Sequence, residues 1–283
     1  MILVSVVKLE LTPDFAAQLP AGIDIFDHIM RLDGELFRDM ADRRTLRFTL
    51  NDKRYFLKAH YGAGWREIFK NLLTLRLPVL GARNEWLAIK KLEQLGVDTM
   101  HVVAYGERGR NPARRQSFIV TEALEDTESL EDFCADWDRQ PPASPAALRL
   151  KRALITRVAT IARAMHTHGI NHRDFYICHL LLDVSRDVLS VDPDTLTLSL
   201  IDLHRAQIRN RTPRRWVIKD IGALYFSAMR IGLTRRDLYR FMTVYRDTPL
   251  RETLSADGKF WSRCRLRAAS LYHSFYHELP ANP

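Results

Sequence analysis

One stretch of this chain constrains its fold more than any other, because a cluster of polar and charged residues lies directly before an apolar segment. Residues 171–183 read Asn-His-Arg-Asp-Phe-Tyr-Ile-Cys-His-Leu-Leu-Leu-Asp. Polar groups this close to a buried strand have to be held by hydrogen bonds or by a ligand. The segment is therefore either an ordinary turn before a strand, or a loop that presents Asp174 for chemistry.

The residues around Asp174 favour the second interpretation. His172-Arg173-Asp174 is followed by a polar residue, His179, five positions after the acid. This is the pattern of a kinase catalytic loop, in which the Asp accepts the proton of the attacking hydroxyl. The preceding residues 148–167 predict a helix that Gly169 ends, which gives the loop a rigid support. The buried face of that helix recurs at spacings of four, three and four residues: Leu154, Val158, Ile161 and Met165.

Composition limits the setting and the partners. The 283 residues allow one large domain or two small ones, and three scattered cysteines indicate a reducing compartment. No uncharged apolar run is long enough to span a membrane. The net charge of +9 is concentrated in residues 205–240, which hold ten Lys/Arg and two Asp/Glu. This basic block is either a solvated face or a surface for an anionic partner.

The N-terminal part predicts a small antiparallel sheet and a lysine–acid pair. Residues 35–38, 45–50 and 55–60 are expected to be strands, with a tight turn at Asn51-Asp52. Lys58 ends the third strand, where it either extends to water or contacts a phosphate. Glu85 begins a helix predicted to end at Gly96. It either complements the helix dipole or reaches back to hold Lys58 against a nucleotide.

Two further segments complete the expected nucleotide site. Residues 102–105 and 117–121 are expected to be strands, and Glu122-Ala123-Leu124 then forms a hinge whose backbone groups could hold an adenine. Residues 196–201 alternate as a strand that delivers Asp202. Its carboxylate either caps a turn or binds Mg²⁺, which prefers hard oxygen ligands. Asp220 lies in an apolar helical segment, where it could accept amide protons from the Asp174 loop.

An amphipathic helix is expected at residues 61–80, where Trp65, Ile68, Phe69, Leu72 and Leu73 recur at helical spacing with Arg66, Lys70 and Arg76 nearby. It is either a helix that faces the core or a surface for lipid or a large amphiphilic substrate.

Together these features resemble the protein-kinase-like fold and, more narrowly, the bacterial lipopolysaccharide kinase family, nearest to its kinases of the first core heptose. The similarity covers about residues 30–255 and includes runs outside the general kinase pattern. These runs are residues 43–48, 73–86, 104–109, 171–182, 201–207 and 219–228. The resemblance implies an α+β fold with two lobes: a small antiparallel-sheet N-lobe at residues 29–123 and a helical C-lobe at 124–283. Residues 1–28 are set apart as a leader of unknown role.

The resemblance also implies ATP and Mg²⁺, and phosphate transfer to a heptose hydroxyl, expected to be O4 of heptose I. By this similarity Asp174 is the catalytic base and Asp202 binds Mg²⁺. His172, Arg173 and Asp220 support the loop. The nucleotide contacts are assigned to Lys58, Glu85, Glu122 and Leu124. His179 stands where kinases place a metal-binding Asn, and imidazole is a poor Mg²⁺ ligand.

Three functions follow as hypotheses. The first is phosphorylation of lipopolysaccharide core heptose at the cytoplasmic face of the inner membrane, with peripheral membrane contact. The second is a related kinase of another sugar, such as Kdo or a later heptose. The third is a non-catalytic basic binding module. No nucleic-acid motif accompanies the basic charge, so nucleic acid is not expected as a partner, whereas an acidic protein such as acyl carrier protein is. All kinase versions require Lys58, Asp174 and Asp202 to converge on one nucleotide cleft.

Overall fold

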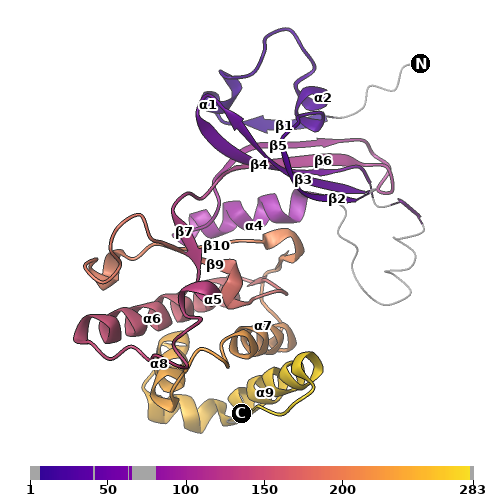
Figure 1. Ribbon diagram of the computed structural model, residues 1–283. Coiled ribbons are helices and arrows are strands. Elements are labelled where there is room, and N and C mark those ends of the chain that lie inside the picture. Colours follow the sequence, from indigo (N-terminus) through magenta and orange to yellow (C-terminus); the bar gives the residue numbers. More distant parts are fainter. Residues whose placement is uncertain (1–6, 41, 63, 66–80, 281–283) are drawn as a thin grey trace. The chain divides into compact units, whose positions relative to one another are not determined.

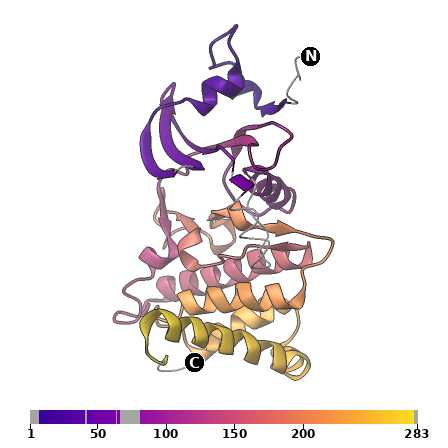
Figure 2. The same cartoon turned by 90° about the vertical axis from the view of Figure 1, so that its right-hand side faces the viewer.

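The computed structural model describes residues 7–40, 42–62, 64–65 and 81–280 (Figure 1). The chain divides into two compact units. The first comprises Met1–Lys91 and Met100–Leu124, and the second comprises Leu92–Thr99 and Glu125–Pro283. The first contains the large sheet and the second contains most of the helices (Figure 2). The predicted α+β fold class, with an antiparallel sheet followed by a helical part, is confirmed.

The first unit is built on a six-stranded sheet in the order β1-β5-β6-β4-β3-β2, in which every neighbouring pair is antiparallel. Its strands are β1 (Val7–Leu11), β2 (Glu35–Met40), β3 (Arg43–Leu50), β4 (Lys53–His60), β5 (Val102–Arg108) and β6 (Gln116–Glu122). Its helices are α1 (Pro13–Ala16), α2 (Ile25–Met30) and α4 (Arg83–Gln94), the last of which ends within the second unit.

The β3–β4 hairpin places Lys58. Asn51 and Asp52 form its turn with positive φ angles of 48° and 64°, which short polar residues tolerate better than most. On β3 the side chains of Leu46 and Phe48 are buried, as expected of alternate residues on one face of a strand. The resulting register sets Lys58 opposite Thr45 on one side. On its other side β4 pairs with β6, so Lys58 lies on an inner strand of the sheet.

Residues 7–28 are an integral part of the first unit, although the sequence analysis set residues 1–28 apart as a leader. β1 pairs with β5, and the side chains of Phe15 and Phe26 are both 1% exposed within the sheet core. The short helices α1 and α2 bring these two rings into place. Such short helices have almost no hydrophobic periodicity, which is why the sequence analysis did not predict them.

The second unit is mainly helical. Its helices are α5 (Leu130–Phe133), α6 (Pro145–Thr167), α7 (Arg214–Ser227), α8 (Arg235–Arg246) and α9 (Leu250–Tyr276). Its short strands are β7 (Thr127–Ser129), β8 (Ile170–Asn171), β9 (Leu180–Asp183), β10 (Leu198–Leu200) and β11 (Gln207–Ile208). Helix α6 is capped by the side chain of Ser144 and starts with Pro145, and the buried face predicted for it is buried in the structure. Helices α7 and α9 lie side by side (Figures 1 and 2).

Short strands frame the loop that carries Asp174. β8, which precedes the loop, pairs with β11, and β9, which follows it, pairs with β10 and β7. Gly169 is required just before β8, because its φ is +82° and a Cβ there would lie 1.7 Å from the Arg209 carbonyl oxygen. The loop is therefore anchored at both ends by sheet pairing.

The amphipathic helix expected at residues 61–80 lies almost wholly outside the described residues. Within the described part of the chain, no helix is both long enough and apolar enough to cross a bilayer.

Candidate active site

Asp220 fixes the backbone of the Asp174 loop. It is completely buried on α7, and its carboxylate accepts the amide protons of His172 at 2.7 Å and Arg173 at 2.9 Å. Nε2 of His166, on α6, lies 3.3 Å from the same carboxylate. The expected contact between Asp220 and the loop is present. It stabilises Arg173 at a φ of 78°, a left-handed conformation that a non-glycine residue adopts only where its surroundings enforce it.

His172 links the loop to the end of β10. Its Nε2 lies 2.9 Å from the carbonyl oxygen of Ile201, so Nε2 carries the proton in this contact. Burial lowers the pKa of His172, because the charged imidazolium is desolvated. A neutral imidazole thus ties the Asp174 loop to the residue immediately before Asp202.

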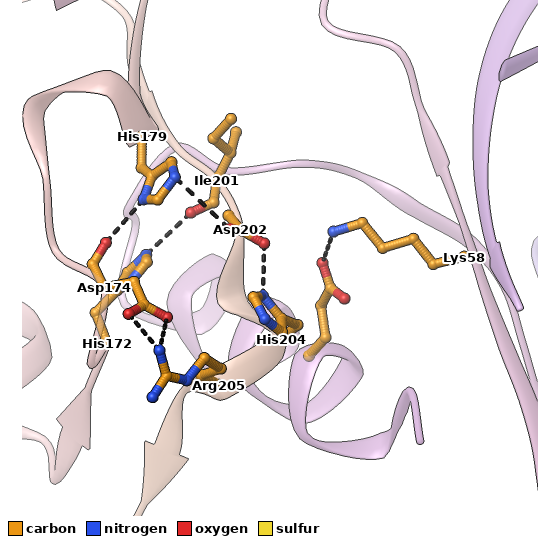
Figure 3. A network of polar contacts seen from close by, with 9 residues as sticks. Lys58, His172, Asp174, His179, Ile201, Asp202, His204 and Arg205 are labelled. Carbon is orange, nitrogen blue, oxygen red and sulfur yellow. Dashed lines mark hydrogen bonds and ion pairs between the residues drawn. The ribbon is translucent and has the colours of Figure 1, made fainter. Parts of the chain in front are cut away.

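Arg205 holds the Asp174 carboxylate. Its Nη1 donates to Oδ1 at 2.6 Å and to Oδ2 at 3.0 Å (Figure 3). The Asp174 carbonyl oxygen lies 2.7 Å from Nδ1 of His179, which donates to it. The side chain of Asp174 is 16% exposed, so its carboxylate is oriented but still accessible.

Asp202 lies between two imidazoles. Its Oδ1 is 2.6 Å from Nδ1 of His204, and its Oδ2 is 3.6 Å from Nε2 of His179 (Figure 3). Asp202 has a φ of 60° and ends the segment that leaves β10. Because Nδ1 of His179 contacts the Asp174 carbonyl oxygen, its Nε2 is left facing the Asp202 carboxylate.

In the first unit, Lys58 and Glu85 form the predicted ion pair. Nζ of Lys58 lies 2.6 Å from Oε1 of Glu85, whose side chain is 1% exposed. The start of α4 is fixed by the amide of Ala82, which donates to Oγ of Ser117 at 3.0 Å. One turn further, Trp86 stacks on Tyr105 with ring centroids 4.4 Å apart. These contacts from β5 and β6 place Glu85 against β4.

Glu122 and Leu124 lie where the first unit ends. The Glu122 amide donates to the carbonyl oxygen of His101 at 2.9 Å, and its carboxylate is 4.0 Å from Nζ of Lys53. Leu124 is the last residue of the first unit. Their expected contact with an adenine stays a prediction. The convergence of Lys58 with Asp174 and Asp202 also stays a prediction, because it joins the two units.

Four residues of the site were missed or misjudged from sequence. Arg205 and Arg209 were counted only as part of the basic block, yet Nη1 of Arg209 donates to Oδ1 of the buried Asn171 at 2.6 Å. His166 and His204 were not singled out. The available signal was local: His204 and Arg205 lie two and three residues after Asp202, in a short 3-10 turn from which His204 contacts Asp202 and Arg205 contacts Asp174.

The described residues contain no group of three or more His, Cys, Asp or Glu side chains arranged to hold a metal ion by themselves. Mg²⁺ does not need such a cage, because it is usually bound by one or two carboxylates together with substrate phosphates.

A braced loop with an oriented Asp, an Asp after the next strand and a buried Lys–Glu pair are together typical of protein-kinase-like phosphotransferases. Comparison with known proteins agrees with this class. The model of the lipopolysaccharide kinase (Kdo/WaaP) family matches residues 27–245. The chain therefore belongs to the lipopolysaccharide kinase (Kdo/WaaP) family, as the sequence predicted, and is a phosphotransferase.

Individual relatives are similar over nearly their whole length. The chain is 54% identical over 252 residues to the lipopolysaccharide core heptose(I) kinase WaaP of Escherichia coli K12, covering 89% of this chain and 92% of the relative. It is 51% identical to the protein of the same name from Pseudomonas aeruginosa PAO1, over 89% and 91% of the two chains. A solved structure, WaaP in complex with acyl carrier protein, matches with a TM-score of 0.79 and 45% identity, over 94% of this chain and 99% of that one.

Proposed function

We propose that this enzyme transfers a phosphoryl group from ATP to a heptose hydroxyl of the lipopolysaccharide inner core, expected to be O4 of heptose I. The observation that carries the proposal is the identity of 51–54%, over at least 89% of the chain, to relatives named for heptose(I) phosphorylation. The family requires ATP as the phosphate donor. Kinases accelerate this transfer mainly by positioning the reactants and by neutralising phosphate charge, so the site needs residues for both functions.

Asp174 is the proposed base for the sugar hydroxyl. A general base has to keep one orientation while a substrate approaches it, and the double contact with Arg205 supports this. The bonds from Asp220 to the amides of His172 and Arg173 hold the backbone on which Asp174 is carried. Proton acceptance by Asp174 is expected to contribute about 10²–10⁴ in rate.

The first unit is the proposed nucleotide-binding part. Lys58 orients the ATP phosphates, and its 2.6 Å contact with Glu85 supports this role because the partner keeps the ammonium at one position. The backbone of Glu122 and Leu124 holds the adenine. The second unit carries the base, the metal ligand and the acceptor site.

Mg²⁺ fits the donor atoms around Asp202. The carboxylate is a hard oxygen ligand, 30% exposed, and its Oδ2 faces Nε2 of His179 at 3.6 Å. When bound, the ion would neutralise phosphate charge. Asp202 is the proposed ligand, while His179 serves mainly to hold the Asp174 carbonyl oxygen, since imidazole is a poor Mg²⁺ donor.

Two partners accompany the proposal. The first is lipid A-linked core at the cytoplasmic face of the inner membrane, which would supply both the acceptor sugar and an anionic surface. The second is acyl carrier protein. It is supported by the solved structure of WaaP in complex with acyl carrier protein, a relative at 45% identity, and by the net charge of +9 on this chain, which favours an acidic partner.

The test compares Asp174→Asn with wild type on dephosphorylated core, with the product located by mass spectrometry. The variant is expected to lose about 10²–10⁴ in kcat, because the amide cannot accept the hydroxyl proton. Asp183→Asn is the matched control: this acid lies at the end of β9, and its carboxylate accepts protons from the amide and the hydroxyl of Ser185, away from Asp174. Wild-type turnover by Asp174→Asn would refute the base, and transfer to Kdo alone would refute the acceptor.

A further inference from the structure

A row of aromatic side chains leads away from the Asp174 loop. Tyr176 follows two residues after Asp174, and its amide donates to the Asp174 carbonyl oxygen at 3.0 Å. The ring centroid of Tyr176 lies 6.3 Å from that of Phe226, on α7. Phe226 in turn lies 6.0 Å from Phe275 and 6.2 Å from Tyr276, near the end of α9. We call these four rings the aromatic row.

The row ends on the surface, where an ordinary core cluster would not. The side chain of Phe275 is 69% exposed, although it contacts Phe226 and Tyr276. Tyr176, Phe226 and Tyr276 are half-buried, so the row is partly accessible along its length, and apolar groups accessible side by side mark a binding site more often than an isolated exposed residue does. The inner end of the row is Tyr176, whose amide bonds the carbonyl oxygen of the proposed base Asp174, so the row begins at the proposed reaction site.

Close packing of α7 on α9 keeps the row together and brings positive charge to it. Gly222 on α7 has no side chain, and a Cβ there would lie 2.6 Å from Cγ of Arg267 on α9. The stem of Arg267 therefore crosses α7 at this glycine. Its charge acts on Tyr176: burial raises the pKa of the Tyr176 hydroxyl, and the guanidinium of Arg267 opposes that rise. At the outer end, the guanidinium of Arg230 lies 4.9 Å from the ring centroid of Tyr276.

We propose that the aromatic row, with Arg230 and Arg267, is a binding subsite for the sugar rings of the anionic core oligosaccharide next to the reacting heptose. This inference rests on the function proposed above. Aromatic faces are electron-rich and attract the C–H groups of a sugar ring, while guanidinium groups pair with phosphate and carboxylate groups. An acceptor that brings its hydroxyl to Asp174 extends over the residues beside it, and the row begins there.

Phe275 allows the row to be tested with little risk to folding, because most of its side chain is in water. Phe275→Leu is expected to raise KM for core oligosaccharide stripped of its acyl chains by roughly three- to tenfold, while kcat and the KM for ATP stay unchanged. Phe275→Tyr keeps the ring and is expected to stay within about twofold of wild type. Leu266→Ala is the matched control, since Leu266 is 63% exposed on the same helix and lies outside the row.

The outcomes separate the subsite from the proposed function. If wild type phosphorylates core heptose but Phe275→Leu has an unchanged KM for the stripped acceptor, the subsite is refuted and the function stands. If the KM rises only with acylated lipopolysaccharide, the row binds acyl chains and the sugar assignment is overturned. If wild type transfers no phosphate to heptose, the proposed function itself fails. Arg267→Gln is expected to raise the same KM, by an amount that shrinks at high salt.

Discussion

The two units each bury an acid next to the proposed chemistry, and the acids differ in what they hold. Asp220 in the second unit is 0% exposed and accepts protons from two backbone amides, so it determines the shape of a loop. Glu85 in the first unit is 1% exposed and accepts from the end of the Lys58 side chain, so it determines where a charge lies. The same side-chain chemistry thus serves folding in one unit and the proposed nucleotide contact in the other.

The largest expected effect is that of Asp220→Ala. It leaves two buried amides without an acceptor, so the free energy of unfolding should fall by about 2–6 kcal/mol, at about 1–3 kcal/mol per group, and activity should fall with it. Urea denaturation and kcat measure the two losses. Asp220→Asn keeps an acceptor oxygen and should lose less of both. A loss of activity without any loss of stability would contradict the comparison.

Glu85→Gln should instead act mainly on the nucleotide. Replacing the charged partner of Lys58 is expected to lower kcat/KM for ATP by roughly ten- to a hundredfold, the range of a hydrogen bond to a charged group. The matched control is Glu10→Gln, which breaks the surface pair of Glu10 with Lys90, at the same 2.6 Å distance but about 40% exposed. That change should leave ATP kinetics unaltered. Equal effects of the two variants would remove the distinction.

Arg205→Ala separates the orientation of the base from its presence. The carboxylate of Asp174 would remain, but its two contacts with Nη1 would be lost, and kcat is expected to fall by about tenfold, well short of Asp174→Asn. Arg205 is 41% exposed, so water replaces part of the interaction. Arg205→Lys should recover part of kcat with the acceptor KM unchanged. A loss confined to stability would show a structural role alone.

The smallest expected effect is a dependence of stability on pH that comes from His172. Burial lowers its pKa in the folded state below its ordinary value of 6.5, so the unfolded chain binds the proton more readily. This contribution to stability is complete above pH 6.5 and is lost as the pH falls below it, at up to about 1.4 kcal/mol per pH unit. Denaturation at pH 7.5 and 5.5 should show a smaller difference for His172→Gln than for wild type. An equal difference would exclude His172.

Local patterns in the sequence were sufficient to predict most of the longer helices and strands and most of the proposed site residues. The alternation of β3, the turn at Asn51-Asp52 and the buried face of α6 each depend on residues within a few positions of one another. Such patterns are set by backbone conformation and by side-chain period, which the sequence states directly. The spacing from His172 to His179 led to the kinase class in the same way.

Contacts between distant residues were decided only by the tertiary structure. Arg205 reaches Asp174 across 31 positions, and His166 reaches Asp220 across 54. Their side chains give no periodic signal, because the partner is set by how β8 and β11 pair and how α6 and α7 pack. For the same reason residues 7–28 resembled a leader until β1 was seen beside β5. The sequence alone determined the family, the longer helices and strands and the identity of the acids, whereas the packing of these elements decided which groups hold each acid in place.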